Sequence, residues 1–335
     1  YYALGLKKDG TLWSWGQNNQ GVLGTNQDTS CSWSSPVQIG IDNDWQTLGN
    51  TNAGIAAVAG AIKNDGTMWT WGDGGSGQLG NNRECSYSVP VQICHCIGYK
   101  WKCLSFSSDG ALAIDCTGIL WGFGRNYQAQ RSAGQLGTSI NNKSAPAKVC
   151  AALCWKAITM MQSGSMGVTS DGKLYAWGCG HNGQLGLSDW SSGGAGFPCS
   201  PRQVGSATDW KCVWGGEYNG AGLRGNQLYT WGIAYCGVLG HNSQSNFGGM
   251  RSSPISAVGS FHCNLRCVHF ASYGVSALDC CGRLWMWGSN VDGKFGVPNC
   301  PLNKNHSSPV QIMCDRKFGS ISGSYCHQAA ISVTC

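Results

Sequence analysis

A motif of two aromatic residues, separated by one residue and followed by glycine, recurs six times along the 335-residue chain. Its Trp-Gly or Phe-Gly pairs lie 52 to 56 residues apart and begin at Trp15, Trp71, Phe123, Trp177, Trp231 and Trp287. Because residues i and i+2 of a strand share one face, each copy places two rings side by side. A turn containing glycine, such as Asp171-Gly172, precedes each copy, and a Gly-x-(Leu/Phe)-Gly loop such as Gly183–Gly186 follows it. The chain is therefore built from one repeated unit.

Each repeat holds four predicted strands. One begins at a proline (first at Pro36), and the next begins at a tryptophan or another large apolar residue (first at Trp45). The third is rich in alanine, and the fourth is the aromatic strand. Four short strands per repeat of about 54 residues predict a β-propeller, since solenoid repeats are usually shorter and need atypical ends. The 51 glycines and the charged fraction of 11%, against about 25% in typical domains, suit short strands joined by tight turns.

The number of blades stays open at this point. The pattern gives two strands before Pro36, five full sets of four, and three strands after the last Trp-Gly pair, which makes 25. That is one more than six four-stranded blades need and three fewer than seven need. We expect one all-β propeller domain over residues 1–335, with six complete repeats and a partial closing one, hence six or seven blades. The chain begins with Tyr1 and shows no signal peptide, so we expect a processed chain or a portion of a longer product.

Two stretches, Lys8–Gly24 and Ser170–Gly186, closely resemble the repeat of the regulator of chromosome condensation family. The resemblance covers essentially the whole chain and implies a propeller, usually seven-bladed. Members of that family act as guanine-nucleotide exchange factors, enzyme inhibitors, ultraviolet receptors or binders of undetermined partners. The family's histidine near the inner strand is present here only as His327, and the Gly-Trp-Arg-His-Thr motif of the ultraviolet receptors is absent. The 16 tryptophans are therefore expected to be core residues and not a chromophore.

Cysteine is unusually frequent, with 20 residues. Cys103, Cys212 and Cys267 occupy the same repeat position, two residues after the large apolar residue that begins the second strand, and each has another cysteine shortly upstream. Secreted proteins use many cysteines to form stabilising disulfides. The alternative interpretation is that these cysteines are free thiols buried in the core. We predict local disulfides that hold the loop before this strand, with open connectivity. The candidates are Cys94, Cys96, Cys103, Cys150, Cys154, Cys199, Cys212, Cys263 and Cys267.

No pattern in the sequence predicts a catalytic, metal or cofactor site. Four possible zinc ligands lie within eight residues: His262, Cys263, Cys267 and His269. Their spacing is not that of a standard zinc finger, and the sequence has no second cluster that could complete such a site. The glycine-rich stretch Gly72–Gly77 follows a strand without opening a helix, which disfavours a phosphate loop. No serine–histidine–aspartate set or carboxylate pair stands out. We expect a non-enzymatic protein with no metal and no cofactor.

Loops that break the repeat are the predicted interaction sites, because insertions in repeat proteins gather on one face. The candidate residues there are Arg125, Tyr127, Arg131, Trp190, Phe197, Phe247 and Met250, and Asn142 and Asn305 begin possible N-glycosylation sequons. The net charge of +6 comes from 22 scattered basic residues with no basic run, so we do not expect nucleic-acid binding. No apolar run reaches the length of about 18 residues that a membrane helix needs, so no membrane insertion is expected.

These observations support three hypotheses. The first is a non-enzymatic, disulfide-stapled propeller outside the cell or on its surface, with a structural or interaction role, whose partner is a protein or copies of itself in a larger assembly or filament. The second is a partner-binding regulator of the exchange-factor or enzyme-inhibitor type. The third is a propeller that binds glycans. The oxidation state of the cysteines separates the first from the second, because a cytosolic regulator is not expected to carry disulfides.

Overall fold

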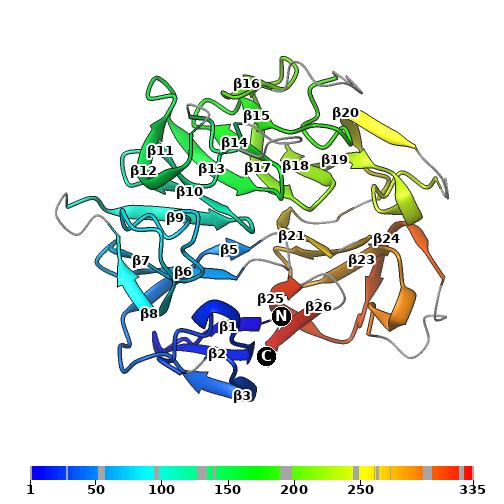
Figure 1. The fold of residues 1–335 in the computed structure, drawn as a ribbon. Coiled ribbons are helices and arrows are strands. Elements are labelled where there is room, and N and C mark those ends of the chain that lie inside the picture. Colours follow the sequence, from blue (N-terminus) through cyan, green and yellow to red (C-terminus); the bar gives the residue numbers. More distant parts are fainter. Residues whose placement is uncertain are drawn as a thin grey trace.

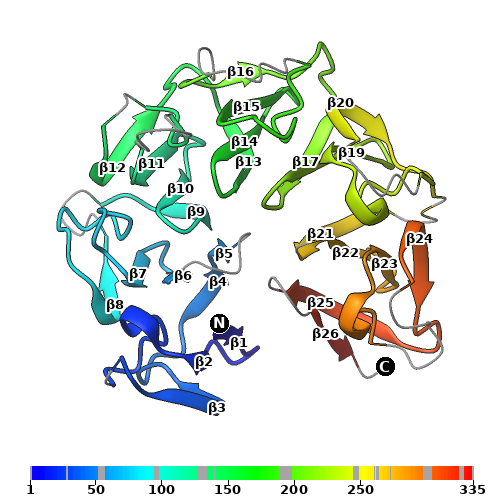
Figure 2. The same ribbon diagram turned by 45° about the vertical axis from the view of Figure 1, so that its right-hand side comes forward.

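The structure is a computed structural model that describes residues 2–27, 29–51, 57–93, 98–126, 134–138, 141–188, 198–243, 249–259, 261, 264–271, 273–296, 304–323 and 328–333. The described residues form a ring of antiparallel sheets around a central axis (Figure 1; Figure 2). The predicted all-β propeller is confirmed. Among the described residues, no helix is long and apolar enough to cross a membrane.

Five sheets hold all four strands of the repeat, ordered from the centre of the ring outward. They are β4 (Trp45–Leu48), β6 (Val58–Lys63), β7 (Met68–Gly72) and β8 (Tyr87–Gln92); β9 (Trp101–Phe106), β10 (Gly110–Asp115), β11 (Leu120–Gly124) and β12 (Lys143–Val149); β13 (Trp155–Met160), β14 (Gly164–Thr169), β15 (Leu174–Gly178) and β16 (Arg202–Gln203); β17 (Trp210–Gly215), β18 (Asn219–Arg224), β19 (Gln227–Ile233) and β20 (Met250–Ser256); and β21 (Leu265–Ala271), β22 (Gly274–Asp279), β23 (Leu284–Gly288) and β24 (His306–Ile312).

The two ends of the described chain form incomplete sheets. β1 (Tyr2–Leu6), β2 (Leu12–Gln17) and β3 (Ser32–Gln38) make a three-stranded sheet, and β25 (Lys317–Gly323) pairs with β26 (Gln328–Val333) alone. A two-residue strand, β5 (Asn50–Thr51), runs parallel to β9 and is the one described strand that the repeat did not predict. Short 3-10 turns lie at Asn19–Gly21, Tyr235–Gly237 and Val291–Gly293, each within a glycine loop. No pairing joins β26 to β1 in the described residues, and Figure 2 shows the two end sheets on either side of a gap in the ring.

Five of the six turns before the aromatic strands are held by a carboxylate, from Asp9, Asp65, Asp115, Asp171 or Asp279. Asp9 accepts hydrogen bonds from the Thr11 backbone N–H (3.1 Å) and the Thr11 hydroxyl (2.6 Å), and the Thr11 hydroxyl in turn accepts the indole N–H of Trp13 (2.9 Å). These bonds from Thr11, and then those from Lys7, lower the pKa of Asp9 to about 2. A side chain that bonds its own backbone two residues on favours a tight turn. The strand therefore starts at a fixed point, with its first ring tied to the turn.

Aromatic rings also join neighbouring sheets. The tryptophans of four Trp-Gly pairs are completely buried: Trp71, Trp177, Trp231 and Trp287. Each donates its indole N–H to a carbonyl in the glycine loop of the preceding sheet, as Trp71 does to Val22 at 2.8 Å. Trp45 packs edge-on against both Trp69 and Trp71, with ring centroids 6.2 and 6.4 Å apart. Tryptophan thus fills the core between blades, and its polar N–H is satisfied there.

Candidate interaction surface

In six of the seven described sheets the innermost strand carries a β-bulge, one residue after its first large apolar residue. In the third complete sheet, for example, Trp155 pairs with Thr169 and Ala157 pairs with Val168, so Lys156 is left without a partner position. The same register shift recurs in every described sheet that has this strand. The bulged residues are Gln46, Lys102, Lys156, Lys211, Arg266 and Gly319. A bulge re-aims a side chain, so each of these side chains leaves the regular pleat of its strand.

Four consecutive bulged residues are basic, and we call Lys102, Lys156, Lys211 and Arg266 the basic arc. Lys102, Lys211 and Arg266 are exposed, and Lys156 is half-buried. Their strands, β9, β13, β17 and β21, lie nearest the centre of the ring (Figure 2). Among the described residues, none of the four forms an ion pair. The arc is therefore a curved positive surface around the central axis.

The turns that precede the aromatic strands lie along one rim of the ring. The basic arc lies on this same rim. The backbone N–H of Trp101 donates to the carbonyl of Gly66 in the preceding turn at 2.8 Å, and Trp155 donates in the same way to Gly118 at 2.8 Å. Trp210 repeats the contact with Gly172 at 3.0 Å. These bonds fix the starts of β9, β13 and β17, and the bulges that follow them, at the same height in successive blades.

Carboxylates near this rim are engaged with other cations. Lys63 lies 2.7 Å from Asp42 and 3.0 Å from Asp44, and Arg224 lies 2.7 Å from Asp209. Asp279 is buried and accepts hydrogen bonds from the Arg283 backbone and from its guanidinium, the latter at 2.7 Å. Burial alone would raise the pKa of Asp279, but these bonds and one from Trp285 hold it below its usual value. The charge of the basic arc is therefore not neutralised by these groups.

The cysteine that follows the bulge packs between sheets. Cys103 lies against the cluster formed by Leu112, Ile114 and Trp155, and burial raises the pKa of its thiol to about 11. Burial likewise raises the pKa of Cys212 and of Cys267. A thiol with a raised pKa is a poor nucleophile, so these residues act as small apolar core residues.

Five disulfide candidates are free thiols in the structure: Cys103, Cys150, Cys154, Cys212 and Cys267. No disulfide joins any two of these five, and Cys103 and Cys267 pack against the apolar clusters between sheets. Cys199 is exposed and lies against Gly134 of the preceding sheet. Cys281, which was not a candidate, is disulfide-bonded. Cys94, Cys96 and Cys263 lie outside the described residues.

Most of the predicted interaction-loop residues also lie outside the described residues: Tyr127, Arg131, Trp190, Phe197 and Phe247. Arg125 lies 3.8 Å from Asp109, and its carbonyl accepts the Gln135 side-chain amide at 2.8 Å. Met250 is half-buried at the start of β20 and pairs with Ile233. The structure does not bring Arg125 and Met250 together, because they belong to different sheets.

The remaining candidates lie apart from the basic arc. Asn142 is exposed, and its side-chain oxygen accepts the Asn126 backbone N–H at 2.9 Å. Asn305 is half-buried, and its side-chain oxygen is shielded from solvent. Of the four-residue cluster, Cys267 and His269 lie two apart on β21, whereas His262 and Cys263 are outside the described part of the chain. Within that part, no group of three or more histidine, cysteine or acidic residues could hold a metal ion.

Sequence reasoning missed the basic arc because its members are 54 or 55 residues apart and no local run exists. The signal was present in the alignment of the repeats: the residue after Trp101, Trp155, Trp210 or Leu265 is always basic. In a ring of blades, residues at the same repeat position lie in neighbouring blades, so four such residues form one surface.

Comparison with known proteins agrees with this architecture. The sequence model of the regulator of chromosome condensation (RCC1) repeat matches residues 9–58, 65–114 and 171–217. The chain is 28% identical over 323 residues to the mitochondrial RCC1 domain-containing protein RUG3 of Arabidopsis thaliana, covering 93% of this chain and 68% of that protein. It is 28% identical over 247 residues to the ultraviolet-B receptor UVR8 of the same plant, covering 71% of this chain and 52% of the receptor.

Other relatives are matched over a smaller share. The chain is 28% identical over 195 residues to the probable E3 ubiquitin-protein ligase HERC3 of Homo sapiens, covering 56% of this chain but 17% of the ligase. The chain thus spans about two thirds of RUG3, half of UVR8 and less than a fifth of HERC3.

Solved structures share the fold at low identity. Human WBSCR16 superposes with a TM-score of 0.80 at 18% identity, covering 99% of this chain and 85% of that one. Yeast RCC1 (Prp20), in its complex with Kap60, superposes with a TM-score of 0.80 at 19% identity, covering 95% of this chain and 75% of that one. The family-model matches and these relatives together show that the chain carries repeats of the regulator of chromosome condensation (RCC1) type.

Proposed function

We propose that the protein is a non-enzymatic propeller that binds an acidic protein partner through the basic arc. The observation that carries this proposal is the presence, at equivalent bulges of four consecutive blades, of four cations that form no ion pair with any other described residue. Similar proteins bind proteins: yeast RCC1 (Prp20), which shares this fold, binds Kap60 and has binding properties toward Gsp1p and histones. Those partners belong to that protein, and they support here only the class of function, partner binding and regulation.

Electrostatics favour a charged partner at this rim. A surface lined by one sign of charge raises the local concentration of an oppositely charged partner and the rate at which the partner associates. Four lysine and arginine bulges along a short arc match a compact acidic surface better than the extended backbone of a nucleic acid, which binders usually contact with a stripe or patch of many cations.

Charge reversal tests this proposal. The variant Lys102→Glu, Lys156→Glu, Lys211→Glu, Arg266→Glu should bind a fluorescent polyglutamate peptide at least about tenfold more weakly than the unchanged protein, in a fluorescence anisotropy titration at low salt. The matched control is Arg83→Glu, Arg202→Glu, Arg251→Glu, Lys304→Glu, which makes the same charge change at four exposed residues away from the arc. Equal losses in both variants would overturn the assignment to the arc. Tighter binding of a single-stranded oligonucleotide than of polyglutamate would overturn the choice of partner.

The second candidate is a disulfide-stapled scaffold outside the cell or on its surface, assembled from copies of itself or bound to glycans. Its support is the content of 20 cysteines and the disulfide at Cys281. Intact mass after alkylation, with and without prior reduction, tests it. This candidate requires most cysteines to be alkylated only after reduction and the native protein to be polymeric or glycosylated. Alkylation of most thiols in an unreduced monomer would contradict it.

A further inference from the structure

Exposed free thiols gather at the rim that carries the basic arc. Seven described cysteines are both free and exposed: Cys85, Cys116, Cys150, Cys154, Cys199, Cys280 and Cys314. Five of them lie in a turn before an aromatic strand or in a connection to an inner strand, and these are Cys116, Cys150, Cys154, Cys280 and Cys314. The other two, Cys85 and Cys199, precede outer strands at the opposite end of their sheets. The rim that attracts acidic groups therefore also presents most of the exposed thiols.

Two of these cysteines, Cys116 and Cys154, flank the beginning of the arc, and we call them the rim thiols. Cys116 lies in the turn after β10, and its backbone N–H donates to the carbonyl of Lys100 at 2.8 Å. Cys154 lies two residues before Lys156, and its Cβ is 3.7 Å from the position of a methyl group built on Gly118. Because Gly118 belongs to the same turn as Cys116, the rim thiols lie on two segments that contact each other.

Three lysines stand beside the rim thiols. Lys100 and Lys102 are exposed, and Lys156 is half-buried. Within the described part of the chain, none of the three forms an ion pair. Cations at a surface raise the local concentration of an anion, so a small acidic molecule should collect at this part of the rim.

The carboxylates of the neighbouring turns are engaged in other contacts. Asp65 accepts hydrogen bonds from the backbone N–H and the hydroxyl of Thr67, at 2.8 and 2.7 Å. Asp171 lies 2.7 Å from the ammonium group of Lys173. Asp115, which ends β10, is buried. These groups leave the lysines beside the rim thiols available to an acidic molecule.

We propose that the rim thiols are sites of reversible S-thiolation by a small, negatively charged disulfide, and that the adduct weakens binding at the basic arc. In this step the cysteine loses its proton, and its thiolate attacks one sulfur of the disulfide. The S–S bond of the disulfide breaks, and a new S–S bond joins the cysteine to one half of the compound. The other half leaves as a thiolate and takes up a proton. The regulatory part of this proposal rests on the proposed function of the arc.

The adduct acts on the arc through charge. A bound half that carries more carboxylates than ammonium groups places negative charge beside Lys102 and Lys156. This charge lowers the attraction of the arc for an acidic partner. A reducing thiol removes the adduct by the reverse exchange, so the effect is reversible.

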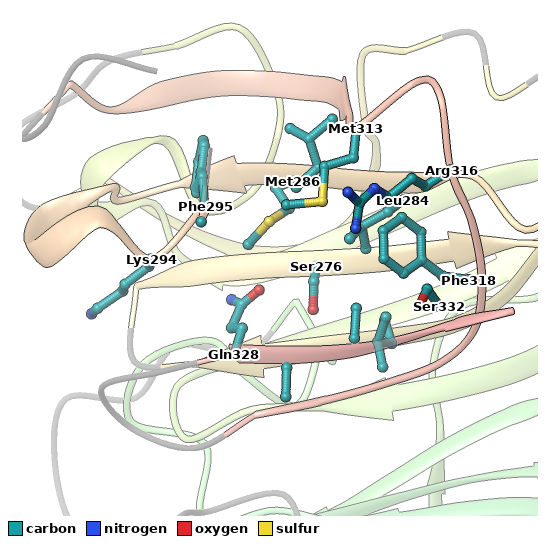
Figure 3. A pocket seen from close by; sticks show the side chains of 15 residues that line it. Ser276, Leu284, Met286, Lys294, Phe295, Met313, Arg316, Phe318, Gln328 and Ser332 are labelled. Carbon is teal, nitrogen blue, oxygen red and sulfur yellow. The ribbon is translucent and has the colours of Figure 1, made fainter. Parts of the chain in front are cut away.

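A small acid has a second place to collect, but it cannot form this bond there. A cavity of about 250 Å³ between the sheet of β21–β24 and the pair β25–β26 is lined by the cations Lys294 and Arg316 (Figure 3). No cysteine is among the described residues that line it. Mass spectrometry of covalent adducts therefore reports on the thiols and not on this cavity.

The first test measures where an acidic disulfide reacts. After mild reduction, the protein is treated at low salt with oxidised glutathione, which is anionic, or with cystamine, which is cationic. Alkylation with iodoacetamide and peptide mass spectrometry then give the rate at each cysteine. The ratio of the anionic to the cationic rate should be at least about fivefold higher at Cys116 and Cys154 than at Cys85, and high salt should remove most of this difference.

Cys85 is a suitable reference because it is exposed at the opposite end of its sheet and follows one cation and one anion, Arg83 and Glu84. Taking a ratio of two reagents cancels differences in how accessible each thiol is. Equal ratios at the three cysteines, or a difference that high salt leaves unchanged, would overturn the proposal.

The second test measures the effect on the arc. Protein that carries glutathione should bind fluorescent polyglutamate about threefold more weakly than protein treated with methyl methanethiosulfonate, which adds a neutral group to the same thiols. The variant Cys116→Ser, Cys154→Ser should lose this difference, whereas Cys85→Ser should keep it. Equal binding after the two treatments, or a difference that persists in the double variant, contradicts the regulatory role. Failure of the untreated protein to bind polyglutamate would contradict the proposed function instead, and the first test would still decide whether the rim thiols are S-thiolation sites.

Discussion

At the scale of single residues, His269 links the packing of an inner strand to pH. It lies on β21, its Nδ1 is buried, and this atom has no hydrogen-bond partner among the described residues. Burial lowers the pKa of His269 to about 4. The folded state therefore holds this imidazole neutral over a pH range in which the unfolded chain, with a pKa near 6.5, would protonate it.

The expected result is a loss of stability as the pH falls below about 6.5, because the unfolded chain then binds a proton that the folded chain does not. By pH 5 the loss from this group amounts to about 2 kcal/mol, at roughly 1.4 kcal/mol per pKa unit. Urea denaturation at pH 7.5 and pH 5 measures it, and His269→Gln should remove most of the difference. The prediction is wrong if His269→Gln shows the same loss between the two pH values as the unchanged protein.

The turns show how far single residues could be predicted. Asp9, Asp65 and Asp171 were predicted from the Asp-Gly pattern and do hold their turns. At Thr117-Gly118 and Cys281-Gly282 the pattern lacks an aspartate, yet Asp115 and Asp279, two residues upstream, supply the carboxylate. Asp115 also accepts the indole N–H of Trp121 directly at 2.9 Å. A carboxylate at the end of one strand reaches the next only once the two are paired, so the pattern of neighbouring residues does not reveal it.

At the scale of elements, the repeat predicted strands well because aromatic and alanine-rich stretches alternate with glycine turns at a fixed period. Bulges were not predicted, because a bulge depends on which residues face each other across two strands. The register shifts at Lys102 and its equivalents are therefore visible only in the paired strands. The open space beside Gly296 was not predicted either, since its loop, Gly293–Gly296, has the same sequence pattern as the loops that receive a ring from the next sheet.

Two glycine substitutions distinguish a glycine loop that receives a ring from the next sheet from one that does not. Gly24 (φ 69°) and Gly296 (φ 64°) adopt the same left-handed backbone, so alanine costs each about 1–2 kcal/mol of conformational strain. Only at Gly24 does the new methyl group meet a ring, that of Trp71. We expect Gly24→Ala to lower the free energy of unfolding by about 3 kcal/mol or more and Gly296→Ala by about 1–2 kcal/mol. Equal losses in urea denaturation would show that the two loops have equivalent neighbours.

At the scale of the whole molecule, stability is carried by contacts between neighbouring sheets. The sheets of β9–β12, β13–β16 and β17–β20 have a complete sheet on each side, whereas the described end sheets, β1–β3 and β25–β26, flank the gap. The 25 strands that the sequence predicted are all present, but their division into five complete and two incomplete sheets was not predictable. That division depends on how the ends of the ring meet in space, and the repeat pattern alone carries no information about this.

Hydrogen exchange measures this difference between the sheets. In a repeat array each unit is stabilised by its neighbours, so units next to a gap open more readily than units between two neighbours. We expect amides of β26, whose residues from Ala329 to Val333 are all exposed, and of β1 to exchange fastest among the strands. We expect those of β10, β14 and β18 to exchange slowest, because they are almost entirely buried. Peptide-resolved mass spectrometry at one pH provides the comparison. Uniform protection around the ring would mean that the end sheets meet and close it, whereas a graded loss of protection toward β26 would mean that the ring opens at its gap.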